Sequence, residues 1–223
     1  MSAAAPLRAA AARPDESREG RGDAIAVAMA VLWFLGAWQS RSLGIWPAVG
    51  TTASLLGVLA IAIEGRALRA ALGADAPRVA LGVAVGLAMA WLTELLYRPV
   101  TAAVPAIGSD VAVLFRAFGD PGPRAVLLLL PLVVAAEELV WRGVVYGALA
   151  RRLPMTAAIV AASVLYAIAH APIGSPALVL TCLCAGACWT ALRAWSGSLA
   201  AAIVAHLVWD LAVLVVRPIL PPA

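Results

Sequence analysis

The sequence contains no lysine and carries little charge of either sign. Of its 223 residues, 13% are charged, whereas soluble domains carry about one quarter charged residues. A hydrophobic content of 64% therefore excludes an ordinary soluble enzyme. The longest strongly polar stretch, residues 1–23, is too short to build a core of its own. We predict a polar cytoplasmic tail over residues 1–23, followed by a single transmembrane domain over residues 24–223.

The scarce residue types exclude further classes of protein. The 16 basic residues are all arginines and form no dense cluster, so nucleic-acid binding is a poor interpretation. The three cysteines, Cys182, Cys184 and Cys188, lie within one apolar run and predict packing residues rather than disulfides. A chain rich in alanine and arginine without lysine is typical of a high-GC genome. We therefore expect it in the inner (plasma) membrane of a bacterium.

Apolar runs long enough to cross a bilayer are abundant, since a transmembrane helix needs about 20 apolar residues. Seven such runs are bounded by Arg, Pro or Gly: Ala24 to Trp38, Trp46 to Ile63, Val79 to Tyr97, Ala125 to Ala150, Met155 to Ala171, Ala177 to Ala194 and Ser198 to Val216. They predict an all-α, polytopic bundle of about seven transmembrane helices. The apolar spacing between Arg98 and Arg124 would add an eighth element lying on the membrane surface.

The distribution of arginine predicts how the bundle is oriented. Arginines are more numerous in the N-terminal tail and in the second, fourth and sixth loops than in the loops between them. Cytoplasmic segments carry the excess of positive charge in membrane proteins. We therefore expect a cytoplasmic N-terminus and an external C-terminus.

A few ionisable residues remain inside the predicted spans, and they point to a functional site. Each such group costs at least ~2.5 kcal/mol in hydrocarbon and usually faces an interior cavity where it acts. The residues are Glu137, Glu138, Arg142, His170, His206 and Asp210, and they include both histidines of the chain. Together they predict a polar site within the membrane.

Spacing along one helix predicts different partners for the two adjacent glutamates. Glu138 and Arg142 are four residues apart and can form an ion pair on one helix face. Glu137 projects about 100° away from Glu138 and is free to meet a different helix. Pro131 lies below this pair, frees a backbone carbonyl and can kink the helix, which would open room for water.

Helix rise predicts which of these groups can meet. With about 1.5 Å per residue, Glu137 and His170 lie at similar depths, ~20 and ~22 Å from the inner ends of their spans. His206, at ~12 Å, is expected to be shallower unless its helix tilts or begins earlier. Asp210 follows His206 by one turn and can fix the tautomer of its ring, and Tyr166 lies one turn below His170.

Three short motifs follow one another on successive spans: Glu137-Glu138-x-x-x-Arg142, Tyr166-x-x-x-His170 and His206-x-x-x-Asp210. In this order they resemble the motifs of the CPBP intramembrane proteases, which include the type II CAAX prenyl endopeptidases. The resemblance covers roughly residues 125–216. The first three spans carry no motif of this kind.

The resemblance implies hydrolysis of a peptide bond within the membrane, in a membrane-associated protein or peptide substrate. Amide cleavage needs a base for water, a proton for the leaving amine and stabilisation of the oxyanion. We assign Glu137 as the base and later acid, and His170 as its water-positioning partner. His206 with Asp210 would face the oxyanion. Sorting signals or membrane-associated precursors are more plausible substrates than prenylated proteins in a bacterium.

The chain departs from the family pattern at two positions. Tyr166 replaces Phe, which adds a hydroxyl group that needs a partner. Asp210 stands where Asn is frequent, and an ionised Asp cannot donate a hydrogen bond to an oxyanion. This favours an orienting role for Asp210 on His206. Glu138 and Arg142 are expected to form a supporting pair.

Three alternatives stay open at this stage. Glu137, His170 and His206 would also form a two-His, one-Glu zinc set, although the adjacent glutamates favour catalysis without a metal or other cofactor. A transporter or proton relay also uses intramembrane Glu, His and Asp, but it predicts matched repeats, and the sequence shows none. A third alternative is a member of the family that has lost catalysis and acts as a membrane scaffold.

Overall fold

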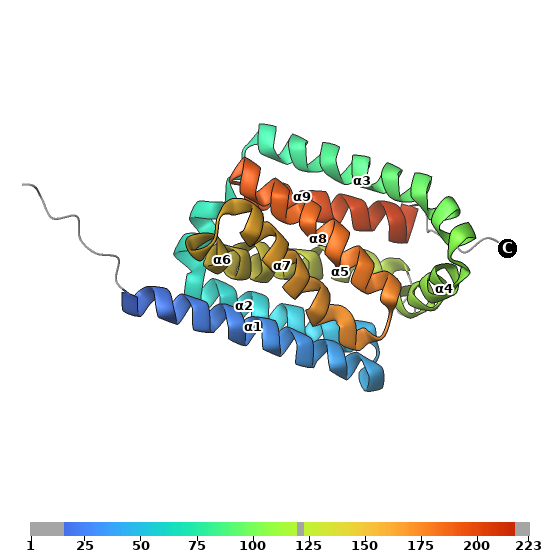
Figure 1. Ribbon diagram of the computed structural model, residues 1–223, viewed down its shortest axis with the longest axis horizontal. Coiled ribbons are helices and arrows are strands. Elements are labelled where there is room, and N and C mark those ends of the chain that lie inside the picture. The colour runs from blue at the N-terminus through green and yellow to red at the C-terminus, as the bar shows by residue number, and fades with distance from the viewer. Residues whose placement is uncertain (1–15, 120–122, 217–223) are drawn as a thin grey trace, which may run out of the picture.

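The computed structural model describes residues 16–119 and 123–216, which form a bundle of helices with no strand (Figure 1). The helices run in chain order as α1 Glu16–Leu43, α2 Ile45–Leu72, α3 Ala76–Ala103, α4 Pro105–Gly119, α5 Pro123–Glu138, η1 Leu139–Val145, α6 Tyr146–Arg152, α7 Met155–His170, η2 Ala171–Ile173, α8 Pro176–Ser196, α9 Leu199–Asp210 and η3 Leu211–Val216. Of the irregular elements, η1 and η3 are π-helices and η2 is a 3-10 helix. The predicted polytopic helical fold is confirmed.

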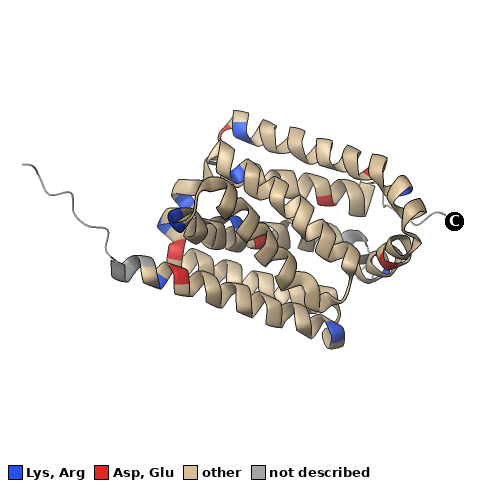
Figure 2. Cartoon of the chain, in the orientation of Figure 1, with Lys and Arg blue, Asp and Glu red and all other residues tan. Residues whose placement is uncertain are grey.

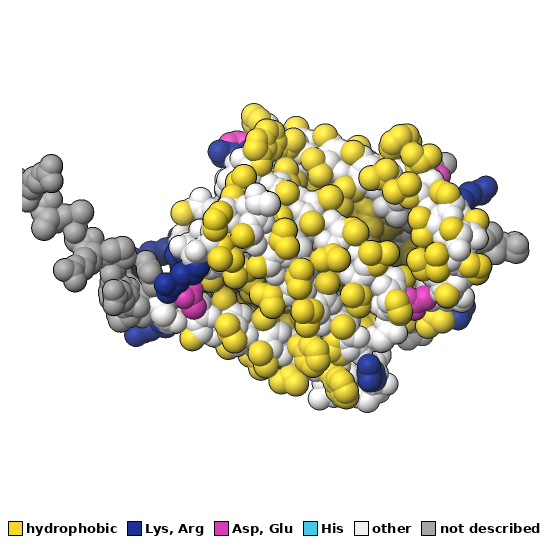
Figure 3. Space-filling view, in the orientation of Figure 1, with side chains coloured by type: hydrophobic (Ala, Val, Ile, Leu, Met, Phe, Trp, Pro, Cys, Tyr) yellow, Lys and Arg dark blue, Asp and Glu magenta, His cyan; other side chains and the backbone are white. Residues whose placement is uncertain are grey.

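Six helical stretches of the described chain are long and apolar enough to cross a membrane: Gly20–Leu43, Ile45–Leu72, Ala76–Ala103, Met155–Ile173, Pro176–Ser196 and Leu199–Val216. Each overlaps a predicted span. The remaining predicted span, residues 125–150, is divided among α5, η1 and α6, and it carries Glu137, Glu138 and Arg142. On the face shown in Figure 3, charged side chains gather toward the two ends of the bundle and the surface between them is largely apolar, while Figure 2 also shows a few charged positions on the central helices. The protein is an integral membrane protein.

The ends of the chain differ from the sequence-based boundaries. Helix α1 begins at Glu16, inside the segment predicted as a polar tail. Residues 1–15 of that tail and the C-terminal residues 217–223 lie outside the described part of the chain. The orientation inferred from arginine counts and the division into tail and membrane domain stay predictions.

The stretch predicted to lie on the membrane surface contains helix α4. Helix α3 continues through Pro99 to Ala103, and α4 follows almost at once. Asp110 of α4 accepts hydrogen bonds from the Ser175 hydroxyl at 2.8 Å and from the Ala177 backbone N–H at 2.7 Å. These bonds use a free N–H at the start of α8, so α4 is tied to the N-terminus of α8.

Helix α9, which carries His206 and Asp210, is held against α3 by two glycines. A Cβ atom added at Gly82 would lie 2.6 Å from the Ala201 carbonyl oxygen, and one at Gly86 would lie 2.6 Å from that of Ala205. Only glycine allows so close an approach, and small residues four apart let membrane helices pack backbone to backbone. These two glycines therefore let α9 approach α3 closely.

Candidate active site

The two glutamates lie where α5 changes into a π-helix. Helix α5 continues through Pro131 to Glu138, and the irregular turn is η1, which begins at Leu139. Single π turns inside α-helices are frequent at functional sites because they redirect side chains. In this structure the irregularity lies after the glutamate pair, not at the proline below it.

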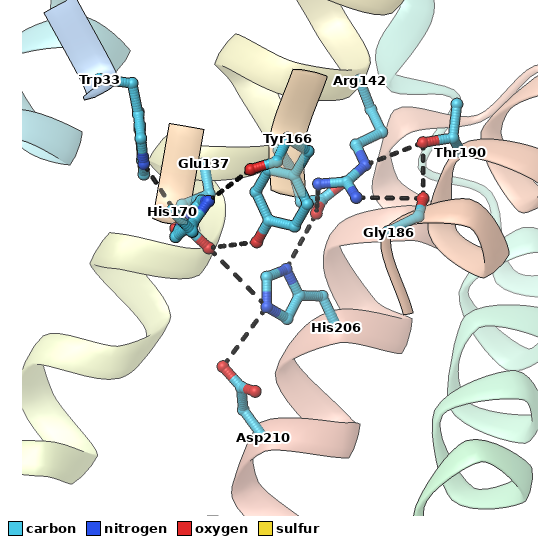
Figure 4. Close-up of polar contacts among 10 residues, drawn as sticks. Trp33, Glu137, Arg142, Tyr166, His170, Gly186, Thr190, His206 and Asp210 are labelled. Atoms are coloured by element: carbon cyan, nitrogen blue, oxygen red, sulfur yellow. Dashed lines mark hydrogen bonds and ion pairs between the residues drawn. The ribbon is translucent and has the colours of Figure 1, made fainter. Parts of the chain in front are cut away.

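Glu137 meets helix α7, as its angle to Glu138 predicted. Its Oε2 accepts a hydrogen bond from the Tyr166 hydroxyl at 3.3 Å, and its Oε1 lies 3.4 Å from His170 Nε2 (Figure 4). The carboxylate is 7% exposed. The hydroxyl by which Tyr166 departs from the family pattern thus has a partner within the site.

Glu138 forms the predicted pair with Arg142 and also a contact that the sequence did not indicate. Its Oε1 accepts from Arg142 Nη1 at 2.9 Å and lies 2.9 Å from His206 Nδ1. Its Oε2 has no hydrogen-bond partner among the described residues. Glu138 therefore joins η1 to α9.

Arg142 extends this network to α8. Its guanidinium donates to the Gly186 carbonyl at 3.2 Å and to the Thr190 hydroxyl at 3.3 Å. It also lies over the Tyr166 ring at 4.4 Å, a distance suited to a cation–π contact. Arg142 is thus buried, hydrogen-bonded to α8 and packed against the Tyr166 ring of α7, as expected of a supporting residue.

Both nitrogens of the His206 ring face carboxylates. Nδ1 faces Glu138, while Nε2 lies 3.5 Å from Asp210 Oδ2 and 3.8 Å from Glu137 Oε2. Trp189 stacks on the ring, with centroids 3.6 Å apart and planes 18° apart. The predicted neighbourhood of Asp210 and His206 is present, and His206 is at the depth of the glutamates rather than shallower.

The structure thus brings together all seven residues selected from the sequence, although their catalytic roles stay predictions. Sequence reasoning missed Trp33 of α1, whose Nε1 lies 3.2 Å from His170 Nε2, and Trp189 of α8. Nothing in the sequence pointed to Trp33, because α1 carries no motif. Trp189 lies on α8, a helix that contains no motif residue.

The zinc alternative can be compared with the positions of its three proposed ligands. A zinc ion would need the Nε2 lone pairs of His170 and His206 and one oxygen of Glu137 around one point. Over residues 16–119 and 123–216, no group of three or more His, Cys, Asp or Glu is placed to hold a metal. In addition, the Trp33 indole N–H already points at His170 Nε2. Whether catalysis uses a zinc ion stays a prediction.

The fold and the site define a class: a polytopic membrane protein with a buried cluster of glutamate and histidine between its helices. Residues 121–212 match the family model of the Rce1-like proteins, described as type II CAAX prenyl endopeptidase Rce1-like. This segment contains all three motifs, and the predicted resemblance is confirmed over it. The match supports a protease. Neither the curated proteins nor the solved structures gave a match.

Proposed function

We propose that this protein is an intramembrane endopeptidase that hydrolyses a peptide bond of a membrane-associated protein with a glutamate-activated water. The observation that carries the proposal is the position of Glu137. It is a buried carboxylate with His170 on one oxygen and His206 near the other. This arrangement places a base, Glu137, and two imidazole rings, those of His170 and His206, around one point. A substrate amide bound there would have a base and a hydrogen-bond donor within reach.

The steps follow from these groups. Glu137 takes a proton from water, and the water oxygen bonds to the substrate carbonyl carbon. His206 donates a hydrogen bond from Nε2 toward the oxyanion, with Glu138 on Nδ1 behind the ring and Asp210 beside Nε2. The carbon–nitrogen bond then breaks as Glu137 returns the proton to the leaving amine, which leaves a free carboxyl and a free amine.

Catalysis without a metal is part of the proposal. The support is that Trp33 directs its N–H at the nitrogen of His170 that a metal would need. We expect purified protein to cleave a labelled library of membrane-associated peptides at the same rate before and after treatment with a chelator. Loss of cleavage with the chelator, restored by zinc, would contradict the metal-free mechanism while leaving the protease assignment intact. An inactive wild-type protein would contradict the assignment itself.

Asp210→Asn separates two roles for Asp210. If the carboxylate orients His206 and supports its positive charge during the reaction, the change should lower kcat by ~10-fold or more. If Asp210 instead donates a hydrogen bond to the oxyanion, Asn supplies the same donor and activity is kept or rises. We expect the first result, because Asp210 Oδ2 is only 3.5 Å from His206 Nε2. Cleavage rates at equal protein level decide between the two roles.

A further inference from the structure

Trp33 brings the first helix of the bundle into the site. It lies on α1, outside the segment that matches the protease family. Its ring is 1% exposed and packs beside His170, with centroids 5.7 Å apart. Figure 4 shows its indole nitrogen directed at the His170 ring. A helix without any motif residue therefore reaches the ring that lies beside Glu137, the proposed base.

The hydrogen bonds of His170 determine where its ring proton lies. Nδ1 is 2.8 Å from the Tyr166 carbonyl oxygen, which can only accept, so Nδ1 carries a hydrogen. Nε2 is 3.2 Å from Trp33 Nε1, and an indole N–H can only donate. Nε2 therefore presents a lone pair. Together the two contacts select a neutral imidazole in one tautomer.

This tautomer bears directly on Glu137. Its Oε1 lies 3.4 Å from the same Nε2, beyond the usual range of a hydrogen bond. If Nε2 carried a hydrogen, the ring would be a cation paired with the carboxylate, and Glu137 would be a poorer base. The other titratable side chains next to the ring are Tyr166 and, on α8, Cys182. Among the ring's neighbours, Trp33 is the one whose N–H faces Nε2.

We propose that Trp33 is a positioning residue: its indole N–H holds His170 as a neutral imidazole with its lone pair on Nε2, so that Glu137 faces no positive charge there. The proposal rests on the proposed function, in which Glu137 is the base. The hydrogen bond from Trp33 also occupies the lone pair of His170 Nε2, so His170 does not take up the proton that Glu137 removes from water. That proton stays available for the leaving amine.

Trp141 provides a matched comparison within the same cluster. Its ring lies 5.9 Å from that of Trp33 and is equally buried. Its Nε1, however, has no hydrogen-bond partner in the described part of the chain. Trp141 thus packs in the same cluster without an indole hydrogen bond. The bond of Trp33 therefore distinguishes its role from packing.

The first test needs no variant. In full-length protein labelled with ¹⁵N at tryptophan and histidine, a scalar coupling across the hydrogen bond should join the Trp33 indole N–H to one imidazole nitrogen. The chain has only two histidines, so assignment is direct. His170 should show a hydrogen on Nδ1 and none on Nε2. A cationic ring, a hydrogen on Nε2, or no coupling would overturn the proposal, whether or not the protein cleaves peptides.

The second test compares Trp33→Phe with Trp141→Phe, which lose the same ring area. With Trp33→Phe, kcat should fall about 10-fold or more while KM changes less than about twofold. The reason is that the substitution misplaces His170 beside the proposed base, which weakens the chemical step rather than substrate binding. The ¹⁵N signals of His170 should change as well. Trp141→Phe removes a ring packed near Tyr166 and His170 but no hydrogen bond, so it should lower kcat less than Trp33→Phe does and should leave the hydrogen of His170 on Nδ1. Equal loss in the two variants, or unchanged His170 signals in Trp33→Phe, would reduce Trp33 to a packing residue.

Discussion

Glu137→Gln is expected to lower peptide cleavage by a factor of ~10² or more while expression and membrane insertion stay normal. The amide has nearly the shape of the carboxyl group but cannot take a proton from water. The Tyr166 hydroxyl can still donate to the side-chain oxygen of Gln, so the contact seen at 3.3 Å is retained. Cleavage of a fluorogenic membrane-associated peptide, at equal amounts of purified protein, measures the change.

The matched control is Glu64→Gln, the same substitution on α2 at a carboxylate outside the site. It should leave the rate unchanged. If Glu137→Gln kept a tenth or more of the wild-type rate, Glu137 would not be the base. The catalytic part of the proposal would then have to move to another carboxylate.

Glu138→Gln should lower the amount of folded protein as well as its activity. The substitution removes the negative partner of Arg142, whose guanidinium is 1% exposed. Breaking a buried pair on one side costs about 3–5 kcal/mol, because an uncompensated charge is left in low dielectric. It also weakens the contact between Glu138 and His206 Nδ1. Yield from membranes and the melting temperature in detergent are the measurements.

The double substitution Glu138→Gln with Arg142→Met separates the two effects. Replacing a buried ion pair by groups without charge is often neutral for stability. We therefore expect yield and melting temperature to recover, whereas activity stays low because His206 has lost its charged neighbour. Recovery of activity together with yield would show that Glu138 acts on folding alone.

Much of the fold follows from features that can be recognised along the sequence. Six of the seven apolar runs coincide with helices long enough to span a membrane, because length and composition alone decide whether a run can do so. The π-helix at Leu139–Val145 could not be predicted in this way. A π turn has no propensity signature, so nothing in the predicted span over residues 125–150 marks where it lies.

The candidate site was partly predictable for a similar reason. A charge within an apolar run is visible in the sequence, and an i,i+4 pair such as Glu138 and Arg142 depends only on helix geometry. The depth argument placed Glu137 level with His170 but placed His206 too shallow. Depth counted from a predicted helix end assumes that all helices stand parallel, whereas the position of α9 depends on its close packing against Gly82 and Gly86 of α3.

The sequence by itself therefore determined the membrane class, the helical spans, the three motifs and the local pair of Glu138 and Arg142. Each of these depends on residues close together in the chain. The tertiary structure alone decided that Glu138 also faces His206, that Trp189 stacks on that ring, and that Trp33 reaches His170 across 137 positions of sequence. Such contacts depend on how each helix is rotated and packed, and a helix without a motif carries no local sign of the side chain it will meet.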